Sequence, residues 1–141
     1  MNREPPGPFF RSASRLLRQL LLGGIGAMLA VTAWAADPTN GKAVYQQNCQ
    51  ACHQPGGAGI KGAFPPLADN PNIAGNPEYL AEVIIKGVSG PLEVNGDHYS
   101  GHMPAMAHID NQKIVDLVAY ILSDLNGEDG PISEASVQAL R

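Results

Sequence analysis

Both cysteines of this 141-residue chain lie in one pentapeptide, Cys49-Gln50-Ala51-Cys52-His53. Two thiols three residues apart on a helical turn can reach the two vinyl groups of one porphyrin and form thioether bonds. A histidine directly after the second thiol is held beneath the ring, where its imidazole nitrogen can bind the iron. The pattern C-x-x-C-H is the attachment signature of c-type haem. We therefore expect one haem c, bound covalently through Cys49 and Cys52, with His53 as the proximal iron ligand.

The same two cysteines admit other interpretations. A thioredoxin-like dithiol would stand at the start of a helix after a strand, whereas this motif follows a helical stretch and no βαβ pattern surrounds it. A structural zinc site needs four nitrogen or sulfur ligands, commonly from a second paired cluster. The sequence has no second cluster, but His98, His102 and His108 could complete a zinc set on paper. The zinc alternative therefore stays open; otherwise we expect these histidines to be solvated.

The first 35 residues have the layout of a secretory signal peptide. A basic segment precedes an apolar run that begins at Leu20, and Ala33-Trp34-Ala35 has the small residues expected before a cleavage site. We predict a signal peptide over residues 1–35 and a periplasmic location. The alternative is an uncleaved single-span anchor, for which a run of about 17 residues is at the lower limit. The basic residues of the segment are Arg3, Arg11, Arg15 and Arg18.

Removal of this segment would change the charge of the chain. The full sequence has 9 basic and 13 acidic side chains and a formal net charge of −4. Because four arginines and one glutamate lie in the segment, cleavage would leave five basic and twelve acidic side chains, a net charge of −7. Such a surface cannot neutralise a phosphate backbone, so we expect no nucleic-acid partner, and it favours partners with a basic patch. The composition, 44% apolar and 16% charged, fits one globular domain, expected over residues 36–127 with an extension over 128–141.

Hydrophobic spacing and capping residues predict three main helices. The first is capped near Asp37 or Thr39 and ends at the haem motif. The second has proline first and glycine last. The third has aspartate as its N-cap, apolar residues at three- and four-residue spacing, and Asn-Gly as its stop. The expected ranges are Thr39–Asn48, Pro77–Lys86 and Asp110–Leu125.

The segments between these helices have different compositions. Gln54–Asn72 is rich in glycine and proline and is expected to wrap the cofactor as a loop. Residues 57–62 match G-x-G-x-x-G, but no strand precedes them and no helix follows, so we reject a dinucleotide site. Leu92–Tyr99 alternates around Asn-Gly and predicts a β-hairpin. A short amphipathic piece in 128–141 is expected to be a packed or frayed extension, with Ile132, Ala135 and Leu140 as its apolar residues.

The sequence offers two methionines for the sixth coordination position of the iron. Met103 and Met106 are the only methionines beyond the signal segment, and both lie just after the predicted hairpin. A thioether sulfur is a soft ligand that favours ferrous iron and raises the potential, which suits a one-electron carrier. The ordinary interpretation of either residue is core or loop filler. In a chain with one haem motif we favour the ligand, and His102 is a further candidate that would lower the potential.

The segment from about Gly41 to Leu125, with its haem motif and its Met-Pro pair, resembles the class I monohaem cytochromes c. The resemblance implies an all-α fold, with three to five helices around one covalently bound haem and a small β-hairpin before the methionine loop. It also implies that the first helix crosses the last. In that crossing Gly41 and Tyr45 would face Leu117 and Tyr120.

The resemblance also implies roles for single residues. In the family the axial methionine is typically followed by proline, which assigns the sixth position to Met103, the residue before Pro104. The stretch Phe-Pro-Pro-Leu around Pro65 is similar to the family segment in which a proline carbonyl accepts the proximal histidine N–H. The same segment supplies a leucine that packs on the ring. Pro65 would then orient His53, and Leu67 would contact the haem.

The function implied by the resemblance is electron transfer. A six-coordinate His/Met haem leaves no open iron position, and no acid and base pair marks a substrate site, so we expect no enzyme activity. We expect a monomeric periplasmic carrier whose partners are a redox donor and acceptor, such as a dehydrogenase, a reductase or a terminal oxidase. Membrane association is expected only if the N-terminal segment stays uncleaved. The alternative is a haem c enzyme or ligand sensor with a displaceable sixth ligand.

Overall fold

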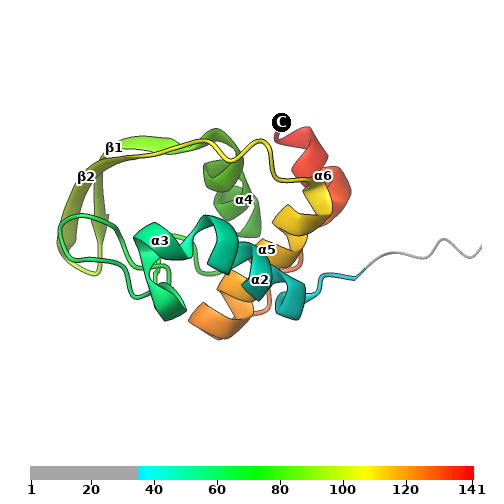
Figure 1. Cartoon of the computed structure of the whole chain (residues 1–141), viewed down its shortest axis with the longest axis horizontal. Coiled ribbons are helices and arrows are strands. Elements are labelled where there is room, and N and C mark those ends of the chain that lie inside the picture. Colours follow the sequence, from blue (N-terminus) through cyan, green and yellow to red (C-terminus); the bar gives the residue numbers. More distant parts are fainter. Residues whose placement is uncertain (1–34) are drawn as a thin grey trace, which may run out of the picture. The chain divides into compact units, whose positions relative to one another are not determined.

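Five α-helices and one two-stranded antiparallel sheet make up residues 35–141, the part of the chain that this computed structural model describes (Figure 1). The predicted signal segment lies outside these residues, except for Ala35. None of the helices described within 35–141 combines the length and the apolar character needed to cross a membrane. In chain order the elements are α2 (Pro38–Asn48), α3 (Gln50–His53), the 3-10 turn η1 (Pro55–Gly57), α4 (Pro77–Lys86), β1 (Val88–Val94), β2 (Asp97–Met103), α5 (Asn111–Asn126) and α6 (Glu134–Ala139).

The three main predicted helices are confirmed as α2, α4 and α5. The Asp37 side chain accepts the N–H of Thr39 at 2.9 Å, so α2 begins at Pro38, one residue earlier than predicted. Asp110 caps α5 by accepting the N–H of Lys113 at 2.9 Å. The helix ends at Asn126, and the residue that caps it, Gly127, has a left-handed φ of 68°. Local capping chemistry therefore sets these boundaries.

The hairpin is longer than the sequence pattern predicts. Val94 pairs with Asp97, so the two-residue turn is the expected Asn-Gly, with φ angles of 53° and 81°. This turn suits the twist of the paired strands. The ladder then continues to the pair Val88 and Met103. The sequence did not predict these outer pairs, because their glycine, proline and serine residues have low strand propensity.

The most extensive contact between two elements of the described chain is where α2 crosses α5. Gly41 is buried, and a Cβ at this position would lie 2.0 Å from the carbonyl oxygen of Asp116 and 2.8 Å from Cβ of Tyr120. The rings of Tyr45 and Tyr120 pack with their centroids 5.5 Å apart. The crossing is the one that the resemblance implies: Gly41 and Tyr45 both contact Tyr120, and Gly41 also lies against the backbone of Asp116.

A buried carboxylate strengthens this crossing. Asp116 is 2% exposed and accepts the N–H of Asp37 at 2.9 Å. It also accepts the side-chain N–H groups of Asn40 at 2.5 Å and Gln112 at 2.8 Å. A buried charge is tolerated only when it is hydrogen-bonded in this way. Asp116 therefore ties the start of α2 to the middle of α5, a role that the sequence did not predict.

The segment after α5 packs onto the core through α6. Ile132 is 8% exposed and Val137 is fully buried, and α6 contacts α5 and α4. Of the three expected apolar residues, Ile132 and Leu140 pack against the core, whereas Ala135 is exposed. Figure 1 shows α6 and the hairpin at opposite ends of the described unit.

We predict that Gly41→Ala lowers the free energy of unfolding by about 3 kcal/mol or more, because the added methyl group overlaps backbone atoms that cannot move without separating the helices. Thermal or denaturant unfolding of the haem-loaded protein measures this change. Gln46→Ala, an exposed position on α2, serves as the control and is expected to change the free energy by less than about 0.5 kcal/mol. Equal stability of the two variants would contradict the close crossing.

Candidate haem site

The haem motif spans the end of α2 and the single turn of α3. The N–H of Cys49 donates to the carbonyl of Tyr45 at 2.8 Å, and the N–H of His53 donates to the carbonyl of Cys49 at 2.9 Å. The Tyr45 hydroxyl donates to the carbonyl of Gln54 at 2.5 Å, where the chain leaves α3. Burial, and then the neighbouring Cys49, raises the pKa of Tyr45 to about 12, so the hydroxyl keeps its proton. The motif is thus fixed at both ends by one core tyrosine.

The two thiols are free, and they differ in exposure. Cys49 is half-buried and Cys52 is exposed. Burial, with a smaller effect of the neighbouring Cys52, raises the pKa of Cys49 to about 11. A thioredoxin-like nucleophile needs a lowered thiol pKa, so these surroundings argue against the dithiol alternative.

His53 has the geometry of an oriented metal ligand. It is 8% exposed, and its Nδ1 lies 2.9 Å from the carbonyl oxygen of Pro65. Because a carbonyl only accepts, Nδ1 carries the proton and Nε2 keeps its lone pair for a metal. Burial lowers the pKa of His53, although the bond to Pro65 opposes this shift. The neutral imidazole needed for ligation is therefore favoured.

A cavity of about 350 Å³ opens beside His53. Cys49 and Cys52 line it together with His53, and Met103 and Met106 line it as well. Leu67, which the resemblance places against the ring, also lines it. Most of the remaining lining is apolar and comes from α4, the hairpin and α5, including Leu80, Val83, Ile84, Leu92 and Ile121.

The loop that carries Pro65 is held by side chains that the sequence analysis missed. Asn126, at the end of α5, donates to the carbonyl of Leu67 at 2.9 Å. Asn70 donates to the carbonyl of Pro66 at 2.7 Å. In the sequence, Asn126 marks only a helix stop. Its side chain also fixes the segment that orients the proximal histidine.

The hairpin is bound to the same loop across the cavity. Lys61 and Asp97 form an ion pair of 2.7 Å. The Asn72 side chain donates to the carbonyl of Glu93 at 2.8 Å, and Asn95 donates to the loop at 3.0 Å. These contacts join the hairpin to the loop that carries Pro65, and both line the cavity.

The other candidate ligands are dispersed. His102 lines the cavity and lies 2.7 Å from the hydroxyl of Ser89 through its Nδ1. His98 is exposed beside Glu93, and His108 is exposed after Met106. Within residues 35–141, no group of three or more His, Cys, Asp and Glu side chains is arranged to hold a metal ion. The described residues thus give the zinc alternative no support.

The donor set of the cavity fits an iron porphyrin. It combines two thiols at thioether spacing, a neutral imidazole with a free Nε2 and soft thioether sulfurs, within mainly apolar walls. Apolar walls suit the porphyrin faces, and the nitrogen and sulfur donors suit iron. The described residues therefore fit haem c.

A family model described as cytochrome c oxidase, cbb3-type, subunit III matches residues 36–121. The chain belongs to the class I c-type cytochromes. A cytochrome c-552 of Thermus thermophilus is 37% identical over 112 residues, which cover 75% of this chain and 68% of that protein. Haem c and haem-based electron transfer are thus properties of the family to which this cytochrome belongs.

Two further relatives are much longer than this cytochrome. The cytochrome c subunit of the quinone alcohol dehydrogenase from Gluconobacter oxydans is 35% identical over 72% of this chain but only 22% of that subunit. The cytochrome c subunit of gluconate 2-dehydrogenase from Pantoea cypripedii is 29% identical over 80% of this chain and 26% of that subunit. The similarity therefore extends over about a quarter of these dehydrogenase subunits.

We predict that the double variant Cys49→Ser, Cys52→Ser releases its haem into acidified organic solvent and accumulates poorly, because the haem completes the core of a small chain. Haem extraction and mass spectrometry measure the attachment. Ser89→Ala, a change on β1 outside the motif, is the control and should retain the haem adduct. A stable double variant with haem that resists extraction would contradict covalent attachment through these sulfurs.

Proposed function

We propose that this cytochrome is an exported one-electron carrier that holds one haem c through thioether bonds from Cys49 and Cys52, with His53 and Met103 as axial ligands. The observation that carries the proposal is the shared cavity, which is lined by both thiols, an imidazole whose Nδ1 is committed to Pro65, and the Met103 sulfur side chain. Bound haem would supply a one-electron iron couple. The chain would hold the ring, orient the imidazole and exclude water.

The edge of the cavity favours transfer to a protein partner. Phe64, Tyr79 and Val88 line the cavity, and each is 38% exposed. Apolar side chains at such an edge suit a small transient contact, below about 1,200 Å². We propose a redox donor and acceptor from among the dehydrogenases, reductases and terminal oxidases. The oxidase-subunit family and the dehydrogenase subunits among the relatives support this class of partner.

The proposed role is transport of electrons without catalysis, in the periplasm. Support comes from the methionines that line the same cavity as His53, since a filled sixth position would leave the iron no site for substrate. The basic and apolar pattern of residues 1–35 supports export, with membrane attachment only if this segment is retained. Mass spectrometry of the purified protein would report the N-terminus and the haem adduct together.

A redox titration and carbon monoxide binding test the proposal. A carrier should give one reversible one-electron couple, and its ferrous form should bind carbon monoxide only slowly or weakly. A haem enzyme or sensor should bind carbon monoxide readily, and that result would overturn the proposal that the protein is an electron carrier.

We predict that Met103→Ala abolishes the methionine-to-ferric-iron charge-transfer band and opens the iron to carbon monoxide and imidazole. Met106→Ala is the matched control, since Met106 lines the same cavity, and both properties should survive this change. Absorption spectra and ligand titrations measure the difference. The reverse pattern would move the ligand to Met106, and no effect of either change would point to His102.

We predict that electron transfer to a basic acceptor slows as ionic strength rises from about 0.01 to 0.2 M, because the Debye length falls from about 30 Å to below 10 Å. Glu93 on the hairpin is the best probe, because Asp97 already pairs with Lys61. Glu93→Lys should weaken the salt dependence without changing the haem spectrum. The control Glu134→Lys makes the same charge change on α6 and should keep the salt dependence of the unmodified protein. A flat curve for the unmodified protein would mean that charge does not steer docking.

A further inference from the structure

The segment between β2 and α5 has few hydrogen bonds of its own. It comprises residues 104–110, follows Met103 directly and contains Met106. Among the described residues, two backbone N–H groups of this segment find backbone partners. Met106 donates to Ile84 at 2.9 Å, and Ile109 donates to Met106 at 3.0 Å. Met106 therefore depends on contacts with other elements, and Met103, paired with Val88 at the end of β2, leads directly into this segment.

The start of this segment is held by the end of α4. A Cβ at Gly87 would lie 2.5 Å from the carbonyl oxygen of Met103 and 2.8 Å from the amide nitrogen of Ala105. Backbone packing of this closeness fixes the chain at its exit from β2.

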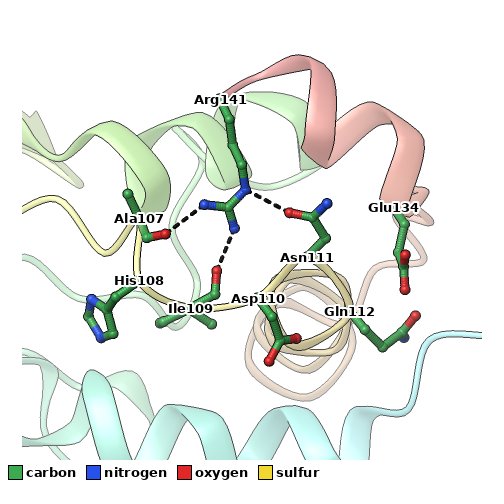
Figure 2. Close-up of a pocket in the computed structure, with 8 residues that line it drawn as sticks. All are labelled: Ala107, His108, Ile109, Asp110, Asn111, Gln112, Glu134 and Arg141. Atoms are coloured by element: carbon green, nitrogen blue, oxygen red, sulfur yellow. Dashed lines mark hydrogen bonds between the residues drawn. The ribbon is translucent and has the colours of Figure 1, made fainter.

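Arg141 holds the second half. Its Nε donates to Oδ1 of Asn111 at 2.6 Å, and its Nη1 donates to the carbonyl of Ala107 at 2.6 Å. Its Nη2 donates to the carbonyl of Ile109. Figure 2 shows the guanidinium above these three acceptors, with one bond to each. One side chain thus joins two carbonyls of the segment to the first residue of α5 through three hydrogen bonds, which we call the Arg141 fork.

The three oxygens that accept hydrogen bonds from Arg141 are neutral. Asp110 lies beside them, but its carboxylate pairs with Lys113 at 2.7 Å. The planar guanidinium fixes the spacing of the oxygens that it binds, in a way that a single ammonium cannot. Asn111 also donates to Gln138 at 3.0 Å, which links the same point to α6.

We infer that Arg141 is a positioning residue for the axial methionine. The inference rests on the methionine ligation proposed above. A thioether is a weak ligand, so the fraction of molecules with an open iron depends on how firmly the chain holds the sulfur. Loss of the Arg141 fork frees the carbonyls of Ala107 and Ile109 to bind water, and the segment opens more often. External ligands then bind more tightly in proportion to the open fraction.

Imidazole titration of the ferric holoprotein tests the inference. Arg141→Ala should raise the apparent affinity for imidazole about tenfold. It should also weaken the methionine charge-transfer band and speed amide exchange of residues 106–109. Arg141→Lys keeps the charge but not the fork, and should be intermediate.

Two controls separate positioning from charge and from stability. Lys42→Ala removes one positive charge from the exposed side of α2, and Val44→Ala removes buried packing from the same helix. Both should bind imidazole as the unmodified protein does. Wild-type affinity and amide exchange in Arg141→Ala, or an equal gain in Val44→Ala, would overturn the inference and leave the proposed function intact. Absence of the methionine band from the unmodified ferric protein would instead refute methionine ligation, and the inference with it.

Discussion

The close crossing of α2 and α5 is the constraint on which the rest of the structure depends. At Gly41 the two helices approach until no side chain fits between them, and Asp116 accepts hydrogen bonds from the start of α2. The haem motif begins at the end of α2, and α5 ends at Asn126. Fixing the crossing therefore fixes two elements that would hold one face of the porphyrin.

The orientation of the proximal histidine follows from this crossing through a chain of hydrogen bonds. Asn126 binds the carbonyl of Leu67, and the carbonyl of Pro65 accepts the Nδ1 proton of His53. Tyr45, packed against Tyr120 in the crossing, binds the chain where it leaves the motif. The haem motif and the loop that carries Pro65 are thus both held by α2 and α5. This limits rotation of the imidazole and keeps Nε2 available.

Local chemistry made much of the fold predictable. The helix boundaries follow from caps such as Asp110, and the hairpin turn follows from Asn-Gly. The tertiary roles of Asp116 and Asn126 were not predictable, because their partners lie 76 and 59 residues away and no periodic pattern marks them. For the same reason Arg141 was only one basic residue among nine in the sequence. The motif predicted the thiols and the imidazole as donors, whereas the hydrogen bonds that orient them are visible only in the folded chain.

The two sides of the proposed haem are held by different physical means. On the proximal side, two covalent bonds and a buried imidazole would leave the iron little freedom. On the other side, the methionine sulfur would be a weak ligand, and its retention depends on the hairpin and the segment that follows it. The Lys61–Asp97 pair ties the hairpin to the loop, and the Arg141 fork ties the segment to α5. An electron carrier must keep both ligands in two oxidation states, so the side with the weaker bond is the one where the scaffold matters most.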